Sequence, residues 1–210
     1  MIDFYTWSTP NGRKVSIMLE EIGIPYTVHP IDIGRDEQFS EAFTRVSPNG
    51  KIPAIVDNDN GQTLFESGAI LMYLAKKSGK LWARSGKAHW RTVEWLMWQM
   101  GGFGPILGQT HHFVKYNEGK APYAEQRFLT ETRRLYSVLD RRLGEEAYVA
   151  GNYSIADIAI WPWASRFEWH MIDLEVFPNV KRWYVEIAAR PAVQKGFHIP
   201  NPQSSIPMPR

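Results

Sequence analysis

The sequence predicts an α/β domain followed by an all-α domain, on two observations. Residues 1–80 alternate short apolar, β-branched runs with helical periodicity, whereas residues 87–198 carry only long helical patterns. With 44% hydrophobic and 22% charged residues among 210, the composition is that of a globular chain with a sizeable core. We therefore expect a mixed sheet with helices in residues 1–80, a helical domain in 87–198 and a Pro-rich tail in 199–210.

The elements of the first domain are expected in the order β-α-β-α-β-β-α. Thr9-Pro10 opens the first helix, because Thr caps helix N-termini and Pro suits the first helical position, and Gly23 closes it. Pro30 weakens the later half of the second strand or places that strand at a sheet edge. The sequence Asn-Asp-Asn-Gly at 58–61 predicts a hairpin between the last two strands. The expected strands are 2–7, 26–33, 52–56 and 62–65, and the expected helices are 10–22, 38–43 and 67–77.

The second domain is expected to consist of helices separated by Gly, Pro or Asn. The first of them is predicted to be interrupted, since several glycines and Pro105 fall within its uncharged stretch 95–114. Ser154 and Asp157 have the spacing of a capping box at a helix start. The expected helices are 87–116, 123–143, 154–169 and 178–190.

Charge and composition exclude several classes of function. Lys and Arg number 24 against 22 for Asp and Glu, and no long basic run occurs, so nothing indicates binding to nucleic acid. The absence of cysteine excludes disulfides, thiolate metal sites and a cysteine nucleophile. The six histidines lack the helical spacing of metal ligands. We therefore expect no metal, and any thiol chemistry needs a thiol from another molecule.

The sequence shows neither a membrane segment nor a targeting segment. The stretch 95–114 is long enough to cross a bilayer, but its Gly, Pro, Gln and His residues indicate a buried helical region. Charged residues between Asp3 and Glu21 interrupt the N-terminus before an apolar signal core forms. A cytoplasmic location without membrane contact is expected.

Five stretches carry a resemblance to a known family: 9–12 (TPNG), 47–56 (SPNGKIPAIV), 65–70 (FESGAI), 108–113 (GQTHHF) and 153–158 (YSIADI). With the order of elements, they resemble the cytosolic glutathione transferase superfamily and are most similar to its bacterial Nu-class branch. The resemblance covers about residues 1–198. It implies a thioredoxin-like N-terminal domain, glutathione as co-substrate, a homodimer and activity as a glutathione-dependent disulfide reductase.

Thr9 and Asn11 are the expected catalytic residues. At the start of a helix they present a hydroxyl, an amide and the positive end of the helix dipole together, and a helix N-terminus lowers the pKa of a thiol. In thioredoxin-like proteins the reactive cysteine occupies this position. The resemblance therefore implies that Thr9 and Asn11 stabilise the thiolate of bound glutathione, with an ordinary capped helix as the alternative.

Further contacts with glutathione are implied by the resemblance. Ile52-Pro53 matches the cis-proline of the family, whose exposed backbone would pair with the Cys-Gly part of the peptide. Ser67, at a helix N-terminus, would bind the carboxylate of the γ-glutamyl group, and Glu66 its ammonium. Gln38 matches a residue that contacts the glycyl end. The alternative for Gln38, Glu66 and Ser67 is an ordinary role as helix-start or capping residues.

Arg127 is a candidate binding residue on the second domain. With Arg134 and Arg141 it recurs at heptad spacing along one helix, which by itself indicates a solvated basic face. In the resembling branch, the arginine matching Arg127 reaches across a two-fold dimer to the glutathione of the partner subunit.

The predicted function is glutathione-dependent reduction of small disulfides. Two alternatives stay open. The same thiolate could attack carbon, which would make the protein a glutathione S-transferase that conjugates electrophiles. The chain could also be a non-catalytic binding module of glutathione-transferase type.

Overall fold

The computed structural model describes residues 1–209, which divide into two compact units. The first unit comprises residues 1–82 and 190–206, and the second comprises residues 83–189 with the tail from Pro207. The C-terminal helix α9 (Pro191–Phe197) thus belongs to the first unit, although the sequence indicates no separate helix there. The domain boundaries expected from the sequence remain a prediction.

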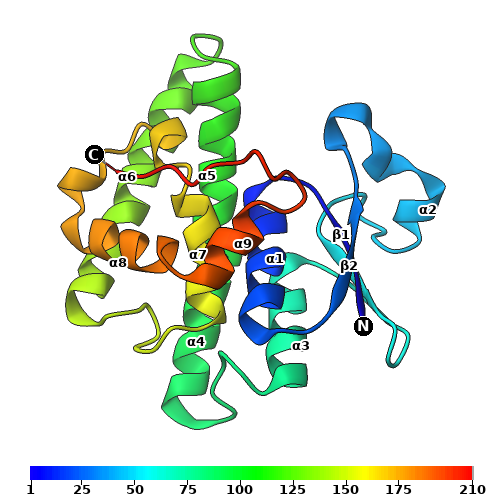
Figure 1. The fold of residues 1–210 in the computed structure, drawn as a ribbon. Coiled ribbons are helices and arrows are strands. Elements are labelled where there is room, and N and C mark those ends of the chain that lie inside the picture. Colours follow the sequence, from blue (N-terminus) through cyan, green and yellow to red (C-terminus); the bar gives the residue numbers. More distant parts are fainter. Residues whose placement is uncertain (210) are drawn as a thin grey trace. The chain divides into compact units, whose positions relative to one another are not determined.

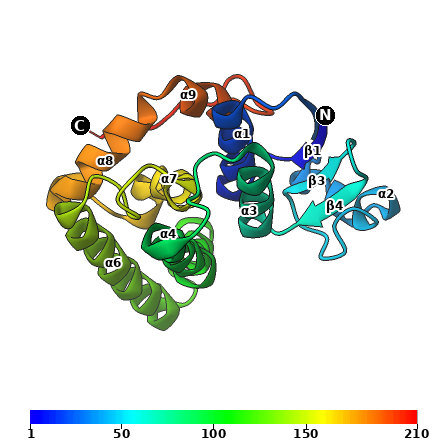
Figure 2. The ribbon, with the colours of Figure 1, turned by 90° about the horizontal axis from the view of Figure 1, so that it is seen from below.

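The first unit is built on a four-stranded mixed sheet of order β2-β1-β3-β4. Its strands are β1 (Ile2–Thr6), β2 (Tyr26–Pro30), β3 (Ala54–Asp57) and β4 (Gln62–Phe65). Only the β1–β2 pair is parallel. Helices α1 (Pro10–Ile22) and α3 (Ser67–Ser78) lie on one side of the sheet and α2 (Glu41–Thr44) on the other (Figures 1 and 2). The predicted order of elements and the mixed sheet are confirmed.

In the first unit, two predicted strands and one predicted helix differ from the structure by more than one residue at an end. β2 ends at Pro30, which pairs with Thr6, the last residue of β1, and the strand lies at the sheet edge as the proline allows. β3 begins only at Ala54. The predicted helix 38–43 is two short pieces, a 3₁₀ turn at Glu37–Phe39 and then α2. The backbone changes direction at Ser40, whose hydroxyl caps α2.

Close backbone approaches hold α1 in place. A Cβ atom on Gly12 would lie 2.3 Å from the carbonyl oxygen of Trp7, so only glycine fits at this first turn. A Cβ atom on Gly196 would lie 2.7 Å from the backbone of Ile17, which shows how tightly α9 packs on α1. The N-terminus of α1 is therefore held directly against the end of β1.

The second unit is helical, as predicted. Its main helices are α4 (Gly86–Trp98), α5 (Gly104–Thr110), α6 (Pro122–Glu145), α7 (Ile155–Ala164) and α8 (Pro178–Ala188). The interruption predicted in the first helix takes the form of π-helical turns at Gln99–Phe103 and His111–Tyr116, so the chain stays helical. A π turn next to Pro105 accommodates a residue that cannot donate a backbone hydrogen bond.

The start of α7 has the predicted capping box. The carboxylate of Asp157 accepts hydrogen bonds from the backbone N–H and hydroxyl of Ser154, from the N–H of Val149 and from the indole of Trp183. Asp157 is fully buried, so this one side chain ties a loop and α8 to the start of the central helix. Further along the chain, the hydroxyl of Tyr184 donates to the carbonyl of Pro207 at 2.6 Å and attaches the end of the Pro-rich tail.

Candidate functional site

The register of the sheet brings most of the predicted site residues together at one end of the strands. Ala54 pairs with Tyr5 on one side and with Phe65 on the other. The residues that precede Ala54 and those that follow Phe65 therefore lie beside the end of β1. These are Ile52-Pro53 and Glu66-Ser67, next to the turn that leads into α1.

Thr9 caps α1 as predicted. Its backbone is extended (φ −115°, ψ 162°), and its side-chain oxygen accepts a hydrogen bond from the N–H of Gly12 at 3.1 Å. Because that bond uses the oxygen as an acceptor, the hydroxyl proton can be donated outward to a ligand. Asn11 follows in the first helical turn and is partly buried. The first turn of α1 thus offers a hydroxyl, an amide and a helix dipole at one place.

The peptide bond between Ile52 and Pro53 is cis, as the resemblance implied. The preceding loop is held by the hydroxyl of Ser47, which donates to the carbonyl of Lys51 at 2.8 Å. Ile52 is partly exposed, so its backbone lies within reach of an extended peptide.

Gln38 lies beside this same loop. A Cβ atom on Gly50 would be 3.4 Å from the carbonyl oxygen of Gln38, so the 3₁₀ turn packs closely against the loop. The side-chain Oε1 of Gln38 is buried and has no hydrogen-bond partner among residues 1–209. A buried amide oxygen without a donor is costly, and a ligand N–H would satisfy it.

Glu66 has an unusual backbone conformation just before α3. Its φ of 70° lies in the left-handed region, which is uncommon for a residue with a side chain and recurs at functional sites. Its carboxylate makes no capping hydrogen bond to α3 and is exposed. Ser67, the first residue of α3, is buried. The start of α3 therefore presents an exposed carboxylate beside a buried hydroxyl.

Lys14 is a site residue that the sequence interpretation missed. It is 1% exposed, and its Nζ donates to the hydroxyl oxygen of Ser67 at 3.2 Å. Burial lowers the pKa of Lys14 to about 7, while the negative charge of Glu66 acts in the opposite direction. The hydroxyl oxygen of Ser67 thus accepts a hydrogen bond from a buried lysine at the start of α3. A signal was present, since Lys14 stands one turn before Met18, in line with the apolar stripe of α1.

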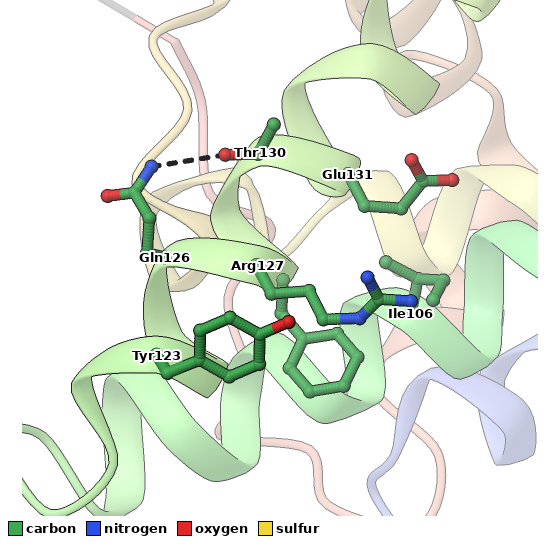
Figure 3. A pocket seen from close by; sticks show the side chains of 7 residues that line it. Ile106, Tyr123, Gln126, Arg127, Thr130 and Glu131 are labelled. Carbon is green, nitrogen blue, oxygen red and sulfur yellow. Dashed lines mark hydrogen bonds between the residues drawn. The ribbon is translucent and has the colours of Figure 1, made fainter.

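Arg127 lies on α6 in the second unit and is exposed. It lines a shallow pocket with Tyr123 and Glu131, and Figure 3 shows the guanidinium of Arg127 extending past the phenol of Tyr123. Glu131 holds a two-bond ion pair with Arg134 at 2.7 and 2.8 Å, and its pKa is lowered mainly by this pair and further by Arg127. The role expected of Arg127 stays a prediction.

Within residues 1–209, no group of three or more His, Asp or Glu side chains is arranged to hold a metal ion. None of the helices described there is long and apolar enough to cross a membrane.

Comparison with known proteins defines the class. The family model of the glutathione S-transferase N-terminal domain matches residues 9–77, and that of the C-terminal domain matches residues 102–191. The chain therefore belongs to the glutathione S-transferase family and is an enzyme of that family.

The chain is also similar to individual proteins of this family. The disulfide-bond oxidoreductase YfcG of Escherichia coli (strain K12) is 48% identical over 198 residues, which cover 91% of this chain and 92% of YfcG. YghU of the same organism, also a disulfide-bond oxidoreductase, is 40% identical over 215 residues, covering 93% of this chain and 73% of YghU. A glutathione transferase structure from Pseudomonas putida, with one glutathione disulfide bound per subunit, is 43% identical with a TM-score of 0.89, covering 95% of this chain and 92% of that one.

Proposed function

We propose that this chain is a glutathione-dependent disulfide-bond oxidoreductase that reduces small disulfides through the thiolate of bound glutathione. The observation that carries the proposal is the first turn of α1. Thr9 and Asn11 lie at this helix N-terminus, in a chain without cysteine. Such a turn stabilises a thiolate, and without cysteine in the chain the thiolate must come from bound glutathione. The names of YfcG and YghU support the reaction class.

The residues at this end of the sheet would each bind a different part of glutathione. The backbone of Ile52, beside the cis bond to Pro53, would pair with the Cys-Gly part of the peptide. The unsatisfied Oε1 of Gln38 would accept an N–H near the glycyl end. The hydroxyl of Ser67 and the N-terminus of α3 would hold the γ-glutamyl carboxylate, and Glu66 the neighbouring ammonium.

The reaction is two successive thiol–disulfide exchanges. The thiolate of one glutathione attacks a sulfur of the disulfide, forming a mixed disulfide and releasing one substrate thiolate. A second glutathione thiolate attacks the glutathione sulfur of the mixed disulfide and releases the other substrate thiolate. Two glutathione molecules become one glutathione disulfide, and the substrate gains two electrons and two protons. The part played by Thr9 and Asn11 is to raise the fraction of thiolate by donating to sulfur.

The active form that we propose is a homodimer in the cytoplasm. Trp90 and Met97 on α4 are 64% and 46% exposed, and Tyr123 on α6 is 81% exposed, which is a large apolar area for a lone chain. A two-fold dimer would cover such surfaces and allow Arg127 to reach the glutathione of the partner subunit. The proposed reaction consumes reduced glutathione, which suits a compartment in which thiols stay reduced.

The test of the proposed function is a graded loss of turnover. Each hydrogen bond to a charged acceptor contributes roughly 1.5–3 kcal/mol, so Asn11→Ala and Thr9→Val should each lower disulfide reductase turnover by about one to two powers of ten. The double variant should lose more, with glutathione disulfide still bound. Thr9→Ser, which keeps the hydroxyl and the helix cap, should retain most of the activity.

Thr63→Val is the matched control, because Thr63 is an exposed residue of β4 outside the site. Full activity in both Thr9→Val and Asn11→Ala would overturn the placement of the sulfur at α1. Abolition by Thr9→Val alone, with Asn11→Ala harmless, would instead indicate one indispensable hydroxyl and a conjugating transferase.

A further inference from the structure

A second group of cations and aromatic rings lies in the helical unit. We name it the Arg166 cluster and define it as Lys115, Tyr116, Arg166 and Trp169. The guanidinium carbon of Arg166 lies 4.3 Å from the centre of the Trp169 ring, and the Nζ of Lys115 lies 5.8 Å from that ring. Tyr116 meets Trp169 edge-on at 5.9 Å. Two positively charged groups therefore lie over the same indole ring.

Among residues 1–209, no carboxylate pairs with either of these charges. Neither the guanidinium of Arg166 nor the ammonium of Lys115 forms a hydrogen bond or an ion pair with any residue that the structure describes. The Nε of Arg166 is buried without a partner. Burial lowers the pKa of Arg166, and the groups that act against it are the phenols of Tyr116 and Tyr184. A partly buried cation without an anionic partner is costly, and a bound anion removes that cost.

His111 adds a neutral donor next to the cluster. The centre of its ring lies 5.2 Å from that of Trp169, and it stacks on the ring of His170 with 4.7 Å between ring centres. The Nε2 of His111 is buried and has no partner within residues 1–209. Burial, reinforced by the charge of Arg166, lowers the pKa of His111 to about 4, so the imidazole is neutral at pH 7. A neutral imidazole supplies one N–H donor without adding charge.

We propose that the Arg166 cluster binds the carboxylate of a small-molecule ligand, and that this ligand is a carboxylate-bearing disulfide substrate. The second half of this inference rests on the proposed function. A guanidinium presents parallel N–H donors that match the two oxygens of a carboxylate, and Lys115 adds a second positive charge. Contact with the ring of Trp169 already restricts the guanidinium of Arg166, so less conformational freedom is lost when the anion binds.

The direct test is calorimetric titration with dithiodipropionate, a small disulfide with two carboxylates, without reduced glutathione so that no turnover occurs. Arg166→Met keeps an unbranched stem on Trp169 but removes the donors, and should weaken binding at least about tenfold. Arg166→Lys should recover part of the affinity. Arg91→Met is the matched control, since it removes the same charge from an exposed arginine of α4 and should leave binding unchanged.

A second measurement separates this inference from the proposed function. The ratio of kcat/KM for dithiodipropionate to that for the uncharged hydroxyethyl disulfide should fall about tenfold in Arg166→Met and stay constant in Arg91→Met. Equal affinity of Arg166→Met and the unaltered protein for dithiodipropionate, or no binding by either, would overturn the carboxylate site. Failure of the unaltered protein to reduce either disulfide would overturn the proposed function, while the titration would still decide whether the carboxylate site exists.

Discussion

Two buried or half-buried cations, one in each unit, meet their surroundings in opposite ways. Lys14 is almost fully buried, yet its Nζ has the Ser67 hydroxyl as an acceptor and the carboxylate of Glu66 nearby. Arg166 is less buried, but its side-chain neighbours are aromatic rings, and its Nε has no acceptor among the described residues. Lys14 therefore sits in a site that is polar before any ligand arrives.

The difference bears on what each site can bind. In the first unit the positive charge of Lys14 lies behind the Ser67 hydroxyl, and Glu66 supplies negative charge beside it, so the site suits a zwitterionic group such as the γ-glutamyl end of glutathione. In the second unit the two charged side chains of the Arg166 cluster, Arg166 and Lys115, are both positive, so the cluster suits an anion. The following predictions test this contrast, beginning with the largest effect.

Replacing Lys14 should weaken the binding of glutathione most. Lys14→Met removes the charged donor behind Ser67, and we expect a loss of about ten- to a hundredfold in affinity for S-hexylglutathione, measured by calorimetry. Lys14→Arg should recover only part, since the fork-shaped guanidinium fits a lysine position poorly. The exposed Lys76→Met of α3 is the control.

An analogue of glutathione without the γ-glutamyl carboxylate tests whether Lys14 affects affinity through that carboxylate. If Lys14 acts through Ser67 on that carboxylate, Lys14→Met and the unaltered protein should bind the analogue equally. A hundredfold difference that persists with the analogue would show that Lys14 only supports the fold of the site.

The outcome for Lys14 also shows where sequence reasoning succeeds and where it stops. Thr9 and Ser67 could be placed at helix starts because their local signals, a cap before proline and a serine at the start of an apolar helix, depend on neighbours in the chain. The cis bond at Pro53 was implied by the family resemblance, because an Ile-Pro pair alone does not indicate it. Lys14 could not be placed, because its partner Ser67 is distant in sequence and its burial depends on how α1 and α3 pack.

The same reasoning applies to the fold. The alternation of strands and helices is encoded in local periodicity, so the order of elements was predictable. The packing of α9 on α1 depends on the close approach of Gly196 to Ile17, which no local pattern reveals. No local pattern in the sequence indicates that the guanidinium of Arg166 lies over the ring of Trp169.

The lowered pKa of Lys14 gives a pH dependence of stability. Because burial lowers this pKa from 10.5 to about 7, the unfolded chain binds more protons than the native chain between these values. Stability from this group therefore rises with pH, by about 2 kcal/mol between pH 7 and pH 9. Urea unfolding of the unaltered protein and Lys14→Met at both pH values measures it as a difference. Parallel changes in the two proteins would mean that Lys14 keeps an ordinary pKa.

The smallest effect is expected for the stability of Arg166→Met, and it contrasts with that of a satisfied arginine in the same unit. Arg166 gains a cation–π contact with Trp169 but loses hydration without an acceptor in return, so we expect a change within about 0.5 kcal/mol. Arg142 donates through Nε to the carbonyl of Val149 at 2.8 Å, and Arg142→Met should cost about 1–3 kcal/mol because that carbonyl loses its donor. Urea unfolding of both variants in ligand-free protein measures the two values. A cost for Arg166→Met as large as that for Arg142→Met would show that Arg166 stabilises the fold, and its lack of an anionic partner would then need no ligand to explain it.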